Sequence, residues 1–148
     1  MEKFDIDYIK EFIKTHKDAK IYLACDSQRI KKKRVKFATV VVVHYNGNNG
    51  AKVFADITYN KVIDAKLSRP FNRMMMEVQM VTEIYSQLED VLIDRDFQIH
   101  IDVNPEEGTG SNVAYNAAKG MIWGMVGVDP ICKPDAFAAS TVADKWSK

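Results

Sequence analysis

The chain has 148 residues, of which 47% are hydrophobic and 28% are charged, and its formal net charge is +1. These values predict one compact globular domain spanning residues 1–148 and exclude a disordered, fibrous or strongly basic chain. No apolar run is long enough to span a membrane, and the polar N-terminus is unlike a signal peptide. Cys25 and Cys132 lie in separate apolar runs, which favours reduced thiols in a cytoplasmic protein with no membrane partner.

The first half of the chain predicts one helix followed by three strands. Apolar side chains recur at helical spacing over residues 5–16, and we treat residues 1–18 as a helix appended to the core. The three strands, rich in β-branched residues, are expected at 20–26, 37–45 and 53–59. A basic connection at 29–36 and an Asn/Gly-rich turn at 46–50 join them, so consecutive strands are expected to pair antiparallel.

The second half alternates helices with strands. Helices are expected at 71–92, 111–125 and 134–146. Strands are expected between them, at 97–103 and 128–133. Alternating elements of this kind favour parallel pairing. The predicted fold is therefore an α/β domain with a mixed five-stranded sheet, in which three antiparallel strands precede two parallel ones, and with helices on both faces.

Four acidic residues occupy positions that can meet at one edge of this sheet. Asp26 ends the first strand and Asp102 ends the fourth, so their carboxylates lie side by side if these two strands are parallel neighbours. Glu77 lies on the packed side of the long helix, and Asp135 starts the last helix. Each acid alone is explained as a turn, capping or solvated residue. Their joint arrangement favours a shared site.

These residues carry a resemblance to the ribonuclease H-like superfamily, and more narrowly to the YkuK-type family of predicted ribonuclease H-related nucleases. The motifs are Cys-Asp-Ser-Gln at 25–28, His-Ile-Asp-Val-Asn at 100–104 and Lys-Pro-Asp-Ala-Phe-Ala-Ala at 133–139. The similarity runs from about residue 20 to the C-terminus. It implies a ribonuclease H-like fold with Glu77 as the acid contributed by the long helix.

The fourth acid has an alternative. The family ends in an Ala-Asp-Lys element, here residues 143–145, so Asp144 competes with Asp135. The two are nine residues apart, about 13 Å along a helix, and cannot easily serve the same ion. We favour Asp135 because nucleases that the chain resembles tend to place their last acid at the start of this helix.

A site made only of carboxylate oxygens selects Mg²⁺ or Mn²⁺ over zinc. The resemblance implies two ions, with Asp26 bridging both and with Glu77 and Asp102 each completing the shell of one. Asp135 would complete the other shell or organise the attacking water. Such a site hydrolyses phosphodiester bonds, so the expected function is a metal-dependent nuclease acting on RNA or DNA.

Substrate contacts are expected beside the acids. Ser27, Gln28 and Asn104 adjoin them and can donate hydrogen bonds to phosphate, sugar or metal-bound water, although turn chemistry alone also explains them. Six cations fall in eight residues: Arg29, Lys31, Lys32, Lys33, Arg34 and Lys36. This run either follows the phosphates of a nucleic acid or belongs to a solvated hairpin whose charges oppose edge aggregation.

Two other functions fit parts of the pattern. A non-catalytic module that binds nucleic acid or joins a complex would keep the fold without turnover, and the lack of a separate specificity element favours it. An actin-like ATPase shares the topology, but residues 25–28 lack a glycine-rich phosphate loop and the chain is too short for two lobes. The complete set of acids favours the nuclease. An exposed edge on the third strand would allow a dimer, and the oligomeric state stays open.

Overall fold

The computed structural model of the protein describes residues 4–31, 34–45, 50–61, 70–103 and 112–148. Its helices and strands, in chain order, are α1 (Ile6–Thr15), β1 (Lys20–Lys31), β2 (Arg34–His44), β3 (Ala51–Lys61), α2 (Pro70–Leu92), β4 (Phe97–His100), α3 (Asn112–Val126), the π-helical turn η1 (Ala138–Ala143) and α4 (Asp144–Ser147). Within these residues, no helix is long and apolar enough to cross a membrane.

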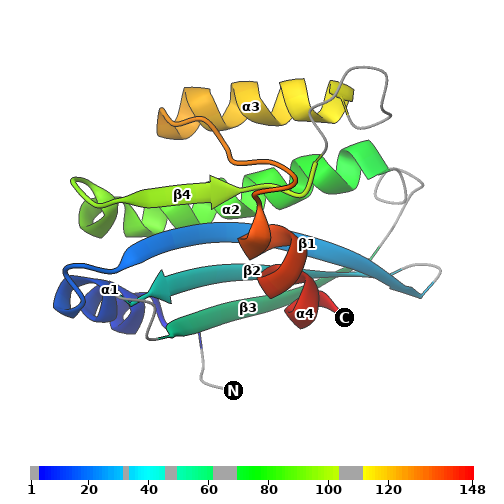
Figure 1. Ribbon diagram of the computed structural model, residues 1–148. Coiled ribbons are helices and arrows are strands. Elements are labelled where there is room, and N and C mark those ends of the chain that lie inside the picture. Colours follow the sequence, from blue (N-terminus) through cyan, green and yellow to red (C-terminus); the bar gives the residue numbers. More distant parts are fainter. Residues whose placement is uncertain (1–3, 32–33, 46–49, 62–69, 104–111) are drawn as a thin grey trace.

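The strands form one mixed sheet in the order β3-β2-β1-β4 (Figure 1). β1 pairs antiparallel with β2, and β2 pairs antiparallel with β3, as the sequence predicts. β1 also pairs in parallel with β4, over a register that runs from Ile21 opposite Phe97 to Ala24 opposite His100. The first strand is thus the central one that joins the antiparallel and parallel parts.

The prediction of a fifth strand at 128–133 is wrong, because the described sheet has four strands. This segment runs beside β4 but makes a single isolated bridge, between Ile131 and His100. Pro130 has no N–H to donate, and the Lys133 N–H bonds to the Val103 carbonyl, which is not the partner that a continued parallel register requires. The ladder therefore stops after one pair, and β4 ends at His100 rather than at 103.

The sequence predicted a connection at 29–36, but the described residues of this segment belong to strands. β1 continues past Asp26 to Lys31, and β2 already begins at Arg34. The buried side chains of Val35 and Phe37 alternate with polar ones on β2 and give this stretch an apolar face. Asp26 therefore lies within a strand and not at its end, while Lys32 and Lys33 lie outside the described residues.

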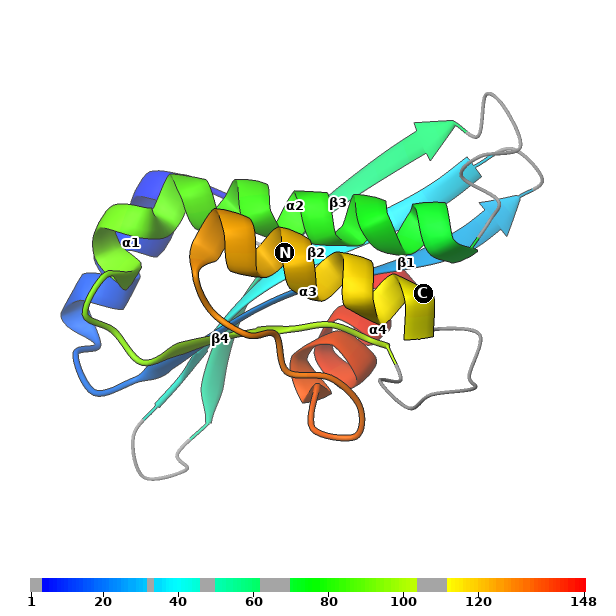
Figure 2. The ribbon, with the colours of Figure 1, turned by 90° about the horizontal axis from the view of Figure 1, so that it is seen from above.

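Helices cover both faces of the sheet, as predicted. On one face α1 and α2 pack over side chains such as Ile21, Leu23 and Cys25, and α3 packs against α2. On the other face η1 and α4 lie over Tyr22 and Ala24 (Figures 1 and 2). The residues of η1 that are buried against this face are alanines: Ala138, Ala139 and Ala143. Their small side chains let the C-terminal segment lie close to β1.

Helix α1 is fixed at both ends by polar groups. The Asp5 carboxylate accepts hydrogen bonds from the backbone N–H groups of Asp7 and Tyr8, which caps the N-terminus. At the other end the Arg95 guanidinium donates to three backbone carbonyls, those of Ile13 (2.7 Å), His16 (2.7 Å) and Ala19 (3.0 Å). Arg95 thereby ties the end of α1 and the start of β1 to the turn before β4.

Replacing Arg95 with alanine should lower the free energy of unfolding by about 2–3 kcal/mol, because three carbonyls lose a charged donor. The measurement is chemical denaturation followed by circular dichroism. Lys17→Ala, which removes a neighbouring exposed cation, is the matched control and should change stability little. Equal stability of the two variants would contradict this role for Arg95.

Candidate functional site

Parallel pairing of β1 with β4 brings Asp26 and Asp102 to the same level of the sheet. Ala24 lies opposite His100, and each acid follows two residues later on its own chain segment. Side chains alternate along β1, so Asp26 shares a face with Tyr22 and Ala24 and points toward η1 and α4. Its carboxyl group is buried, with only 6% of the residue exposed.

The C-terminal helix brings a further acid to Asp26. The Ser147 hydroxyl oxygen lies 2.9 Å from Asp26 Oδ2 and 3.0 Å from the Asp144 carbonyl oxygen. The pKa of Asp26 is raised to about 6, mainly by burial; the nearby negative charges of Asp144 and Asp102 add to this effect, and the Ser147 hydrogen bond opposes it. A hydrogen bond between the two carboxyl groups also contributes, so Asp26 holds its proton in preference to Asp144.

Asp144 is the acid of this pair that stays ionised. Its Oδ2 lies 2.8 Å from Lys148 Nζ, and its Oδ1 accepts a hydrogen bond of 3.1 Å from Gln28 Nε2. The Lys148 hydrogen bond is the main reason that the pKa of Asp144 is lowered. Asp26 and Asp144 therefore form an unequal pair in which one carboxyl favours its proton and the other its charge.

Glu77 reaches β1 from the opposite face of the sheet. It projects from α2, is 6% exposed, and accepts a hydrogen bond of 3.2 Å from the Ser27 hydroxyl at Oε1. Its other carboxyl oxygen is buried and has no hydrogen-bond partner. Burial raises the pKa of Glu77 well above its usual range, the charge of Asp26 adds to this effect, and Ser27 and Arg73 oppose it.

Asp102 has a cation beside it. Lys133 Nζ lies 3.2 Å from Asp102 Oδ1, close enough for an ion pair. The same buried oxygen has no hydrogen-bond partner. The contact is therefore electrostatic, and the oxygen keeps its capacity to accept a hydrogen bond or to bind a cation.

The four acids influence one another electrostatically but do not surround a common point. Among the described residues, no three His, Cys, Asp or Glu side chains are placed so that they could hold a metal ion. Asp26 points from β1 toward η1 and α4, and Glu77 comes from α2 on the opposite face of the sheet. The predicted shared two-ion site is not assembled in this arrangement.

Asp135 lies away from this group. Asp135 is exposed. The pKa of His100 is lowered to about 4 because the ring is buried, and the negative charge of Asp135 partly opposes this lowering. His100 Nδ1 accepts a hydrogen bond from the Ala138 backbone N–H at 3.1 Å, so the proton sits on Nε2 and is donated to Gln98 Oε1 at 2.9 Å. His100 thus fixes the start of η1. The structure brings Asp144, and not the preferred Asp135, to Asp26.

The chain matches the family model described as "Ribonuclease H-like" over residues 6–148. The chain belongs to the ribonuclease H-like family. This confirms the resemblance drawn from the three motifs, which pointed to the YkuK-type branch. No curated protein and no solved structure matches the chain.

Of the other predicted substrate contacts, this ribonuclease H-like domain holds Ser27 against Glu77 and Gln28 against Asp144. Arg29 and Arg34 are exposed on β1 and β2, farther along the strands. The side chain of Lys31 and the whole of Lys32, Lys33 and Asn104 lie outside the described residues. Ser27 and Gln28 therefore support the acids directly in this structure.

Sequence reasoning missed Ser147 and the ion pair of Lys133, and it allowed a lysine partner for Asp144 without identifying Lys148. The residues that follow Asp144 carried a signal, because Ser147 and Lys148 stand three and four positions after it and share its helical face. Nothing local in the sequence indicates that this helix end packs on Asp26. The contact between Ser147 and Asp26 joins residues that are 121 positions apart.

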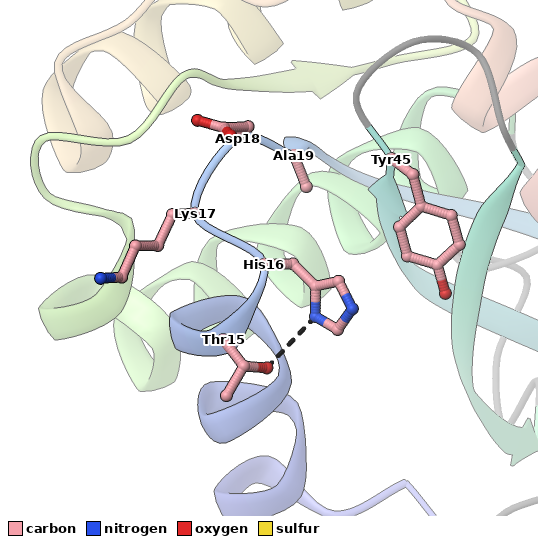
Figure 3. Close-up of a pocket in the computed structure, with 6 residues that line it drawn as sticks. All are labelled: Thr15, His16, Lys17, Asp18, Ala19 and Tyr45. Atoms are coloured by element: carbon pink, nitrogen blue, oxygen red, sulfur yellow. Dashed lines mark hydrogen bonds between the residues drawn. The ribbon is translucent and has the colours of Figure 1, made fainter.

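A pocket of about 220 Å³ lies at the other end of β1, away from the acids (Figure 3). It is lined by Thr15, His16, Lys17, Asp18, Ala19 and Tyr45. His16 Nδ1 is 3.2 Å from Thr15 Oγ1 and 2.8 Å from the Phe12 carbonyl oxygen. These ring contacts close the end of α1, and the lining includes no predicted site residue.

Asp26→Asn should stabilise the protein at pH 8 by about 1–2 kcal/mol, because asparagine carries no buried charge. The folded state raises the pKa of Asp26 to about 6, so it binds more protons than the unfolded state between about pH 4 and pH 6. Stability from this group is therefore present at pH 4 and lost as the pH rises through 6. The gain from Asp26→Asn should vanish near pH 4.

Urea denaturation at pH 4, 6 and 8 without divalent ions measures this gain. Asp135→Asn, at the exposed acid that precedes η1, is the matched control and should show no comparable pH-dependent gain. If Asp26→Asn changes the free energy of unfolding equally at pH 4 and pH 8, the folded state does not raise the pKa of Asp26.

Proposed function

We propose that this protein is a divalent-metal-dependent nuclease that hydrolyses phosphodiester bonds of RNA or DNA at the site formed by Asp26, Glu77, Asp102 and Asp144. Asp144 replaces Asp135 in this proposal because it contacts the Asp26 carboxyl group. Membership of the ribonuclease H-like family supports a nuclease-like role. The observation that carries the proposal is the burial of the Asp26 and Glu77 carboxyl groups, which opposes the ionisation of both, while the charge of Asp26 further opposes that of Glu77.

A cation would relieve this unfavourable arrangement. Glu77 has a buried carboxyl oxygen without a hydrogen-bond partner, and so has Asp102. The four side chains offer oxygen atoms only, and oxygen ligands suit Mg²⁺ and Mn²⁺. In their chemistry these residues fit such ions, and we propose two. Loading would require Lys133 to leave Asp102, because the two positive charges compete for one carboxylate.

The residues of the chain have separable roles in this proposal. When bound, Mg²⁺ or Mn²⁺ would lower the pKa of the attacking water and stabilise the negative charge of the leaving oxygen. Asp26, with a pKa of about 6, gives up its proton near neutral pH. Gln28 and Lys148 hold the Asp144 carboxylate in place, and Ser27 orients Glu77.

The second candidate is a ribonuclease H-like module that binds nucleic acid or joins a complex without cleaving. One observation favours it: within the described residues the acids are not gathered into a metal-holding group. Under this reading Lys133 and Lys148 are permanent structural partners of Asp102 and Asp144.

We also propose a cytoplasmic location, since the two cysteines are free, as expected in a reducing compartment.

Divalent ions should bind and stabilise the protein more strongly at pH 8 than at pH 5.5, because Asp26 and Glu77 must lose protons first. At an ion concentration about one hundred times the dissociation constant, the gain is about 2.7 kcal/mol. The measurement is the thermal midpoint with Mn²⁺ or Mg²⁺ against EDTA. Asp26→Asn should abolish most of the shift and Asp135→Asn should keep it. The same shift in both variants would place the ions elsewhere.

Cleavage is tested with end-labelled single-stranded RNA, single-stranded DNA, duplex and hybrid substrates in Mg²⁺ or Mn²⁺. We expect cutting that EDTA stops and that Asp26→Asn and Asp144→Asn each reduce at least 100-fold, while Asp135→Asn stays within about threefold. Full activity in Asp26→Asn would exclude the proposed site. Salt-dependent binding of any substrate without cleavage would instead support the non-catalytic module.

A further inference from the structure

Strand register places a row of side chains on the same face as Asp26, extending away from the acids. Asp26 lies opposite Ala38, Gln28 lies opposite Lys36, and Lys36 lies opposite Tyr59. Directly opposed residues of antiparallel strands share a face, and so do residues two positions apart on one strand. Arg34 therefore belongs to the same row. We name Gln28, Arg34, Lys36 and Tyr59 the cationic face.

The cationic face is reachable from solvent beyond α4. In both views β1 and β2 run on past this helix (Figures 1 and 2). Tyr59 is 48% exposed, Arg34 is exposed, and Lys36 is half-buried. Lys36 Nζ donates a hydrogen bond of 3.0 Å to the Lys148 carbonyl oxygen, which joins this face to the helix that carries Asp144.

Tyr59 combines an exposed ring with an adjacent cation. The Arg34 guanidinium lies 4.7 Å from the centre of the Tyr59 ring, in a cation–π contact that holds the ring in place. An aromatic ring beside a fixed positive charge matches the two parts of a nucleotide, a flat base and a phosphate. Arg34 and Lys36 give this face a positive charge that is complementary to a phosphate backbone, and the Asp144 carboxylate borders it at Gln28.

The spacing connects this ring to the acids. Tyr59 is two strands across from β1 and two residues along from the level of Asp26, a separation of about 12 Å from strand geometry. A few nucleotides of one strand cover this distance. Stacking on Tyr59 requires a base whose flat surface is open, which an unpaired strand offers and the interior of a duplex does not.

We propose that the cationic face binds a single strand of nucleic acid, with a base stacked on Tyr59 and phosphates on Arg34 and Lys36, and leads it to the acids. This inference rests on the proposed function, whose substrate class it narrows to single-stranded RNA or DNA. Tyr59 and Arg34 act here as binding residues and touch no reacting atom.

The test is fluorescence anisotropy with labelled single-stranded RNA, single-stranded DNA of the same sequence and the matching duplexes, in EDTA so that no cleavage occurs. We expect both single strands to bind more tightly than their duplexes. Tyr59→Leu should weaken single-strand binding about tenfold, which is in the range for one stacked base, while Tyr59→Phe should stay within about twofold. Arg34→Gln should weaken binding and lower its salt dependence.

Equal binding by Tyr59→Leu and the unchanged protein would overturn the proposal, as would tighter binding of duplex than of single strand. No binding to any of these nucleic acids would also overturn it. The nuclease proposal is judged separately, by cleavage in Mg²⁺ or Mn²⁺. If Tyr59→Leu cuts and binds normally and Asp26→Asn does not cut, the cationic face is refuted and the acid site stands.

Discussion

Side chains along β1 point alternately to the two faces of the sheet, and the positions of the acids depend on this alternation. Leu23, Cys25 and Ser27 face α2, and Ser27 meets Glu77 there. Asp26 faces η1 and α4 and meets Ser147. Two adjacent residues of β1 therefore serve opposite faces of the sheet. Ser27 holds the Glu77 carboxyl group on one face, and Asp26 places its own carboxyl group on the other. A slip of one residue in its pairing would exchange the two environments.

The acids divide into two kinds according to whether a lysine neutralises them. Asp102 pairs with Lys133, and Asp144 pairs with Lys148. Asp26 and Glu77 are buried, and no lysine ion pair is described for either, so burial raises the pKa of both. This division gives the site its electrostatic character: two fixed negative charges accompany two carboxyl groups whose burial favours the protonated form.

The C-terminal segment, η1 and α4, covers the face of the sheet that carries Asp26. Its alanines pack on the sheet, the His100 ring accepts the Ala138 N–H, and Ser147 reaches Asp26. The same segment also borders the cationic face, through the bond between Lys36 and the Lys148 carbonyl. Helix α4 therefore supports both the acids and the proposed path for a single strand. A change in α4 would alter both.

The sequence by itself determined the order of the elements through α3, the mixed sheet with helices on both faces, and the family, because apolar periodicity and short motifs are local properties. It also predicted that Asp26 and Asp102 lie side by side if their strands are parallel neighbours, and the register of β1 with β4 places them level, although Asp26 lies within β1 and Asp102 lies beyond the end of β4. Only the tertiary structure decided that the segment at 128–133 makes one bridge, because its register against β4 is not visible in periodicity. Only the tertiary structure brought Asp144 rather than Asp135 to Asp26, since that choice depends on how η1 packs across the sheet.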